Sequence, residues 1–303
     1  MTPVANGPLA LKATLGAVRL AAPVSSRLSG YLAARLWFTP WRLPLGERAV
    51  TKQDAWLTST RPLEVEADGL LLKGYEGGSG PTVLLVHGWG DSSRSMGAFA
   101  KPLIDAGFRV VGMDMPGHGA TSGGQTDALQ IAAAVRALAQ RVGPVHGVIA
   151  HSMGAYGTML ALHDGLAAEK VVLISPAVLL ESAVAPFGEM FALSRKTIKG
   201  LRREIERRFG PSVWTDLAAD RLVRDVDIPA LIVHDPEDPQ VPFVDTERLV
   251  RSWRTARVEP SADLGHTRIL RSDTVIDRAV SYLTQDEGAA SVLRADGLVP
   301  ARV

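Results

Sequence analysis

Cysteine is absent from the 303-residue sequence, and this excludes several kinds of chemistry. A chain without cysteine has no disulfide, no zinc–thiolate site and no cysteine nucleophile. A large net charge is also lacking, because 33 Lys and Arg residues nearly balance 32 Asp and Glu residues. We therefore expect no nucleic-acid partner, and any basic interaction must come from a local patch.

The sequence also lacks a long apolar run. A membrane-spanning helix needs about 18 or more consecutive apolar residues. The best uncharged stretch, 142–163, contains Pro144, four Gly and three His, so it does not qualify. Near the N-terminus, Lys12 and Arg19 interrupt any apolar core of a secretory signal. We expect a cytoplasmic protein.

Acidic residues are missing from residues 1–46, although this segment carries five Lys or Arg residues. Three aromatic residues, Trp37, Phe38 and Trp41, lie near its end. Basic residues beside aromatic ones are typical of a segment that rests on an anionic membrane surface. The alternative, which we favour, is a helix that packs on the main domain.

From residue 61 the residue pattern is typical of a globular α/β protein. Hydrophobic residues make up 46% of the whole chain and charged residues 21%, which allows a sizeable core. Alternation in 63–66, a turn at 67–69 and an apolar run at 70–75 predict a β-hairpin, closed by a Gly-rich loop at 77–81.

Short apolar runs then alternate with helical patterns. Runs with the length and continuity of strands buried on both faces of a sheet occur at 82–86, 109–113, 145–150, 171–174 and 230–233, and 256–259 is a further strand candidate. Helical spacing is clearest at 131–142 and also fits 96–106, 153–163, 244–253 and 274–284. This alternation predicts an α/β fold with a doubly wound, mostly parallel sheet.

One segment, 176–227, has no strand pattern. Apolar residues on one helical stripe are Ile198, Leu201, Ile205 and Phe209. The stripe ends at Gly210, which predicts a helical insertion over the sheet. Residues 195–208 contain seven basic residues against Glu204 and Glu206, so this helix either attracts an acidic partner or surface or presents an ordinary solvated face.

A serine stands where a predicted strand meets a predicted helix. The run 145–150 leads directly into His151 and Ser152, after which the helix begins. So tight a turn strains the backbone and requires small residues two positions away, as Ala150 and Gly154 are. The backbone N–H of Met153, at the start of the helix, then points toward an oxyanion formed when Ser152 attacks an acyl carbon.

A second oxyanion donor and a base are needed to complete such a site. The strand 82–86 ends in His87, Gly88 and Trp89, and Gly88 allows the backbone to approach a substrate closely. We predict the N–H of Trp89 as the second donor. In the C-terminal third, the acidic residues Asp235, Glu237 and Asp238 follow the strand 230–233, and Leu264-Gly265-His266 follows 256–259.

These motifs resemble, in content and order, the α/β-hydrolase superfamily of serine hydrolases, which includes esterases and lipases. The matching segments are the serine turn, the His-Gly-Trp loop, the loop 114–119, the acid loop 238–242 and the Gly-His turn at 265–266. The resemblance implies that Ser152 is the nucleophile, His266 the general base and acid, and Asp238 the carboxylate that orients the imidazole. Asp235 and Glu237 are alternatives for the acid. Ala150 replaces the first Gly of the family's Gly-x-Ser-x-Gly.

The resemblance spans about residues 61–285 and implies an α/β-hydrolase fold with a helical cap insertion. It divides the chain into an N-terminal helical extension (1–60), a core (61–175 and 228–285), a cap (176–227) and a C-terminal tail (286–303). Apolar cap residues are expected to line the substrate pocket, namely Val178, Leu179, Leu180, Phe187, Met190 and Phe191. The alternative is ordinary packing between cap and sheet.

We therefore expect a hydrolase of carboxylic esters with short- to medium-chain acyl groups, which needs no cofactor and no metal. A thioesterase or acyltransferase, a lactonase, an amidase and a carbon–carbon bond hydrolase use the same residues and stay open. A carrier-bound acyl chain would dock on the basic helix 195–208. A catalytically silent binding protein is a further alternative. The other six histidines are expected to be structural.

Overall fold

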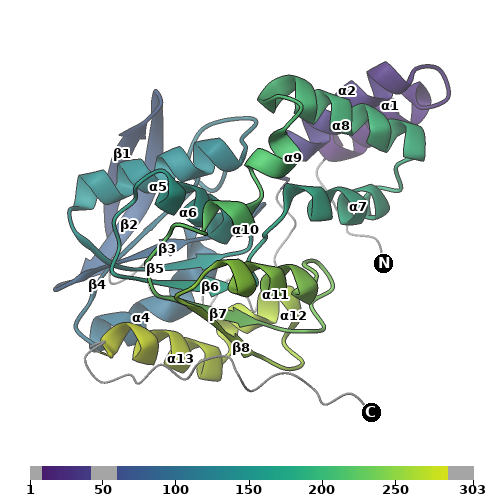
Figure 1. Ribbon diagram of the computed structural model, residues 1–303. Coiled ribbons are helices and arrows are strands. Elements are labelled where there is room, and N and C mark those ends of the chain that lie inside the picture. Colours follow the sequence, from purple (N-terminus) through teal and green to yellow (C-terminus); the bar gives the residue numbers. More distant parts are fainter. Residues whose placement is uncertain (1–8, 42–59, 286–303) are drawn as a thin grey trace, which may run out of the picture.

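The computed structural model describes residues 9–41 and 60–285 (Figure 1). Within them the chain forms one eight-stranded sheet with the order β1-β2-β4-β3-β5-β6-β7-β8. The strands are β1 (Arg61–Ala67), β2 (Leu70–Gly78), β3 (Thr82–Val86), β4 (Arg109–Met113), β5 (Val145–His151), β6 (Lys170–Ile174), β7 (Ala230–His234) and β8 (Ala256–Pro260). The predicted sheet is confirmed.

Two strands give the sheet its antiparallel edge. The hairpin β1–β2 pairs antiparallel, and β2 continues the same way against β4, whereas β3 to β8 pair in parallel. The predicted loop at 77–81 begins later than expected. Gly77 and Gly78 extend β2 and lie opposite Val110 and Arg109, because pairing with β4 holds them in the strand.

Helices cover both faces of the sheet (Figure 1). On one face lie α5 (Ala128–Val142), α6 (Met153–His163) and α11 (Phe243–Ser252), and on the other lie η3 (Ser93–Met96), α4 (Gly97–Asp105), η4 (Ile269–Arg271) and α13 (Asp273–Thr284). The short helix α12 (Gly265–Arg268) precedes η4. The strands β3, β6 and β7 are mostly apolar and buried along their whole length, because both faces of the sheet are covered there. The described core is therefore a doubly wound α/β layer structure.

Four helices interrupt the alternation between β6 and β7. They are α7 (Leu180–Met190), α8 (Arg195–Phe209), α9 (Val213–Asp216) and α10 (Ala219–Leu222). Ser194 caps α8 by accepting a hydrogen bond from the N–H of Thr197, and the helix ends at Gly210. These helices fall within the predicted insertion, although the division of the chain into domains stays a prediction.

Two N-terminal helices, α1 (Leu9–Ala21) and α2 (Ser26–Phe38), lie against the cap helices and away from the sheet (Figure 1). Backbones touch where α2 crosses α8, because a Cβ on Gly30 would lie 2.5 Å from Gly200. Beyond α2, a Cβ on Gly90 would lie 2.9 Å from the carbonyl oxygen of Trp41. The expected packing on the main domain thus occurs chiefly through the cap.

None of the helices in the described ranges combines the length and the hydropathy that a membrane crossing requires.

Candidate active site

Ser152 sits at the turn between β5 and α6. Its backbone has φ 52° and ψ −119°, a conformation that costs free energy for a residue with a side chain. Its N–H donates to the carbonyl oxygen of Ile174 on the neighbouring strand β6, which holds the turn in place (3.0 Å). A Cβ on Gly154 would lie 2.2 Å from the carbonyl oxygen of His87. The turn therefore requires glycine at 154.

Three side chains from separate strand ends meet at this turn. His266 Nε2 lies 3.0 Å from Ser152 Oγ, and His266 Nδ1 lies 2.8 Å from Asp238 Oδ2. All three residues are buried. Ser152 follows β5, Asp238 follows β7 and His266 follows β8, so the carboxyl ends of parallel strands bring them together. This geometry allows the imidazole to take a proton from the serine hydroxyl.

Asp238 is held as a carboxylate. Its Oδ1 accepts from the N–H groups of Gln240 and Val241 at 2.8 Å and 3.1 Å, and His234 Nε2 lies 3.3 Å from Oδ2. Burial raises the pKa of Asp238, but the interactions with His234 and His266 outweigh it and hold that pKa well below its ordinary value. The carboxylate is therefore charged throughout the range in which a histidine titrates.

Asp235, an alternative for the acid that orients the imidazole, instead binds the backbone before His266. Its Oδ2 accepts from the N–H groups of Leu264 and Gly265, at 2.6 Å and 2.7 Å, just before His266. It thereby ties the acid loop to the loop that carries the histidine. Burial raises the pKa of Asp235, yet hydrogen bonds from the N–H groups of Gly265, Glu237 and Leu264 lower it further than burial raises it. Glu237 is exposed, so of the three acidic residues it is Asp238 that contacts the imidazole.

The loop after β3 passes beside the serine. A Cβ on Gly88 would lie 3.2 Å from Ser152 Cβ, which places the backbone before Trp89 next to the hydroxyl. His87 is fully buried, donates from Nδ1 to the carbonyl oxygen of Gly88 and accepts from the N–H of Met115 at Nε2. The Trp89 ring meets the ring of His118 edge to face at 5.3 Å. Two histidines therefore hold this loop.

Met153 is the first residue of α6, so its N–H has no acceptor within the helix. It faces the same end of the sheet as the loop of Trp89, because both follow carboxyl ends of the adjacent parallel strands β5 and β3. Both residues are half-buried. The assignment of these two N–H groups to an oxyanion hole stays a prediction.

His151, next to the nucleophilic position, supports the histidine loop. Its Nε2 donates to the backbone oxygen of His266 at 2.9 Å. Burial, and then the proximity of His266, lower the pKa of His151 to about 3. His151 is therefore neutral at physiological pH. This contact and the contact of His234 with Asp238 were missed from the sequence, because they join residues that only the fold brings together.

The apolar residues predicted to line a substrate pocket occupy different surroundings. Val178 is buried in the main core and Leu179 packs against it, whereas Met190 is 41% exposed. Three others pack against α1 and α2: Leu180, Phe187 and Phe191. These contacts do not test whether any of the six residues binds a substrate, so their part in substrate binding stays a prediction.

In the described part of the chain, no group of three His, Asp or Glu residues has the geometry to hold a metal ion. The chemistry that the site residues can perform relies on a serine, a histidine and a carboxylate.

Solved structures with the same fold include two esterases and a phospholipase. An esterase from Exiguobacterium antarcticum aligns with a TM-score of 0.60 at 17% identity, over 74% of this chain and 100% of that chain. A membrane phospholipase A, described as a bacterial virulence factor, aligns with 0.60 at 19% identity, over 90% and 97%. An esterase from Rhodococcus sp. ECU1013 aligns with 0.55 at 20% identity, over 75% and 98%. At these identities the likeness shows the fold.

A comparison with curated proteins found no significant match. Residues 83–298, more than half of the chain, match the family described as "Alpha/beta hydrolase family". This range contains the serine turn, the acid loop and the histidine loop. The chain therefore belongs to the α/β-hydrolase family.

Proposed function

We propose that the protein hydrolyses carboxylic esters through an acyl-enzyme on Ser152. The observation that carries the proposal is the unbroken pair of contacts from Ser152 Oγ to His266 and from His266 to Asp238. Membership of a hydrolase family and the likeness in fold to esterases support it. Neither determines the substrate.

In the first step, Ser152 Oγ forms a bond to the acyl carbon while its proton passes to His266 Nε2. Asp238 stabilises the imidazolium through Nδ1, and the imidazolium then gives its proton to the departing alcohol as the ester bond breaks. In the second step, a water molecule attacks the acyl carbon and loses a proton to His266. Ser152 recovers its proton from His266, and the carboxylic acid leaves.

Negative charge develops on the carbonyl oxygen in both steps. We assign its stabilisation to the backbone N–H groups of Trp89 and Met153, because both belong to segments fixed beside Ser152. Backbone donors held by the fold need no reorganisation during the reaction. Removing one such donor typically costs about 10²- to 10³-fold in kcat.

The acyl group we propose is of short to medium length. The apolar, half-buried Leu179 supports this, because it follows the strand β6 whose carboxyl end adjoins Ser152. A series of p-nitrophenyl esters tests the proposal. We expect hydrolysis to peak at short or medium acyl chains, and a maximum at long chains would contradict the assignment of chain length.

The loop after β3 runs His87-Gly88-Trp89 rather than through three consecutive glycines, and in this it resembles the group of α/β-hydrolases that act on esters of primary and secondary alcohols. We propose that esters of primary and secondary alcohols are substrates. Esters of tertiary alcohols should be hydrolysed much more slowly, and rapid turnover of a tert-butyl ester would contradict this proposal.

The central test compares the native protein with Ser152→Ala. We expect the variant to lose essentially all ester turnover while its circular dichroism stays native. Activity retained in the variant would refute the mechanism. If the native protein hydrolyses no simple ester but its serine reacts with a fluorophosphonate, the substrate is instead a thioester, a lactone or a carbon–carbon bond.

A further inference from the structure

The basic residues of α8 divide into two groups. Three of its seven basic residues form ion pairs with Glu181, Glu204 and Asp127, at 2.5–2.9 Å, and these are Arg202, Arg207 and Arg208. Over residues 9–41 and 60–285, the other four, Arg195, Lys196, Lys199 and Arg203, form no ion pair. Lys196, Lys199 and Arg203 recur at helical spacing on one side of α8. Their charges are therefore available to an external anion.

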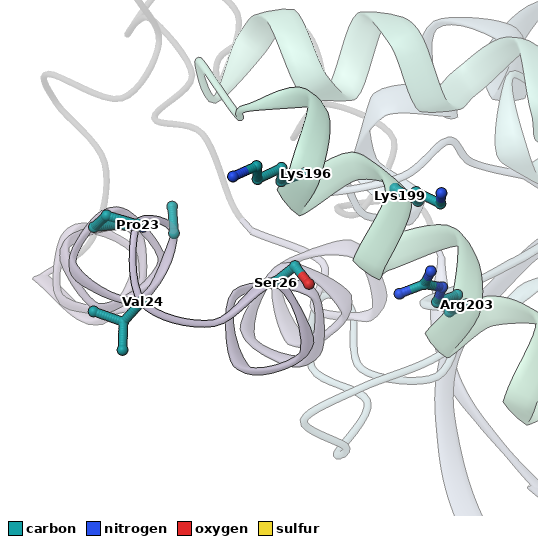
Figure 2. A pocket seen from close by; sticks show the side chains of 7 residues that line it. Pro23, Val24, Ser26, Lys196, Lys199 and Arg203 are labelled. Atoms are coloured by element: carbon teal, nitrogen blue, oxygen red, sulfur yellow. The ribbon is translucent and has the colours of Figure 1, made fainter.

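These three cations border a groove of about 370 Å³ between α8 and the turn that joins α1 to α2. Figure 2 shows Pro23 and Val24 at that turn, across from Lys196, Lys199 and Arg203. No acidic residue is among those that line the groove, and residues 1–46 contain none. Like charges gathered without a counter-charge attract an anion.

Large apolar side chains are exposed beside the groove. Val24, which lines it, is 84% exposed and Leu20, one turn before it, is 78% exposed. Leu28 and Tyr31 on α2 are also exposed, at 50% and 45%. The same two helices carry four exposed cations, namely Lys12, Arg19, Arg27 and Arg35. Neither helix contains an acidic residue.

The buried sides of α1 and α2 are already occupied. Leu11, Leu15 and Val18 pack in a cluster with Phe191, and α2 packs on α8 through Gly30. The exposed side chains therefore lie on the sides of α1 and α2 that do not pack against the described part of this chain. A water-exposed helix surface that combines apolar and basic residues, and lacks acidic ones, fits the interface of an anionic lipid bilayer.

We propose that this surface, made of the outer faces of α1 and α2 together with Lys196, Lys199 and Arg203, binds anionic lipid membranes. Lipid headgroups neutralise the cations while Leu20 and Val24 enter the boundary of the acyl chains. A soluble acidic protein or a free phosphate would satisfy the cations but leave the apolar side chains in water. The proposal concerns binding alone and does not depend on ester hydrolysis.

Sedimentation with lipid vesicles tests the proposal on the full chain. We expect the native protein to sediment with vesicles that contain phosphatidylglycerol, less so as salt rises, and not with vesicles of phosphatidylcholine alone. Reversing three of the free charges (K196E/K199E/R203E) should lower the partition coefficient at least tenfold, on the order expected for several basic residues near a surface. The control R141E/R224E/R251E has the same change in net charge at exposed sites elsewhere and should bind as the native protein does.

The apolar contribution needs a second variant. Leu20→Ser with Val24→Ser leaves every charge in place at two exposed positions, and we expect it to weaken vesicle binding severalfold. Circular dichroism of each variant checks the fold. The proposal is overturned if the native protein sediments with neither kind of vesicle, as a binder of a soluble acidic protein would. It is also overturned if neutral vesicles bind it equally well or if the charge-reversed variant binds like its control.

Discussion

At the scale of the residue, the site depends on the charge of one carboxylate. Asp238 accepts from His266 Nδ1 at 2.8 Å, so the imidazole carries its proton on Nδ1 and presents an unprotonated Nε2 to Ser152, 3.0 Å away. The low pKa of Asp238 keeps this arrangement available at every pH at which the imidazole is neutral.

Replacing Asp238 with Asn tests this directly. The amide NH₂ would face His266 Nδ1 and favour the wrong tautomer, so kcat should fall by about 10³- to 10⁴-fold with little change in the far-ultraviolet circular dichroism. Glu237→Gln is the matched control, because Glu237 lies in the same loop, is exposed and does not contact the imidazole. Steady-state kinetics on a soluble ester would contradict the assignment if both variants kept native kcat.

The order of motifs along the chain was enough to single out Ser152 and His266. The resemblance to the family also indicated Asp238, with Asp235 and Glu237 as alternatives, because all three lie in one short loop and their directions depend on its folded shape. The contact of His234 with Asp238 could not be predicted, because its distance of 3.3 Å is set by how the loop after β7 turns back.

At the scale of the element, glycine determines how the N-terminal helices join the cap. A Cβ on Gly200 would lie 2.4 Å from the carbonyl oxygen of Ser26 and 2.7 Å from Gly30 Cα. Both are backbone atoms, so no side-chain rotation relieves the clash. The two helices can approach this closely because neither has a side chain at the crossing.

The substitution Gly200→Ala should therefore destabilise the protein by about 1–3 kcal/mol, although alanine is the better helix former. Gly16→Ala in α1 is the matched control. A Cβ there meets nothing within 4 Å, so the change should be neutral or stabilise by up to about 1 kcal/mol. Urea unfolding followed by tryptophan fluorescence measures both, and equal free energies of unfolding for the two variants would contradict the packing we describe.

Hydrophobic continuity predicted the buried strands well. The runs at 82–86 and 109–113 match β3 and β4 residue for residue, because a strand covered on both faces is mostly apolar. The end of β2 was misplaced, since Gly77 and Gly78 are typical of a turn and only pairing with β4 keeps them extended. The crossing of Gly30 and Gly200 could not be predicted, because it joins segments that are 170 residues apart.

At the scale of the whole molecule, alternation of strands and helices was sufficient to predict the class of fold. The position of α1 and α2 was not predictable in the same way. Their apolar faces could pack on any apolar surface, and only the fold shows that they pack on α7 and α8. The cytoplasmic location stays a prediction from the sequence.

Stability of the molecule in mild acid should depend on His151. Its pKa falls from 6.5 to about 3 on folding, so between those values the unfolded chain binds more protons than the native one. The free energy of unfolding therefore decreases as pH falls from about 6.5 toward 3, by up to about 1.4 kcal/mol per pH unit from this group.

The substitution His151→Gln removes that titration and places an amide near the position of Nε2. We expect a flatter dependence of the free energy of unfolding on pH between about 4.5 and 7, measured by urea unfolding. Some slope should persist, because burial also lowers the pKa of His87. Identical slopes for the two proteins would show that His151 is not the neutral, buried group described.

The most direct measurement for the central claim is the reaction of the native protein with a fluorophosphonate, followed by mass spectrometry of the intact chain and of its peptides. An active serine paired with a histidine should form one adduct per chain at Ser152, and His266→Ala should slow its formation by orders of magnitude. A native protein that stays unlabelled, or that is labelled at another residue, would contradict a serine hydrolase built on Ser152, His266 and Asp238.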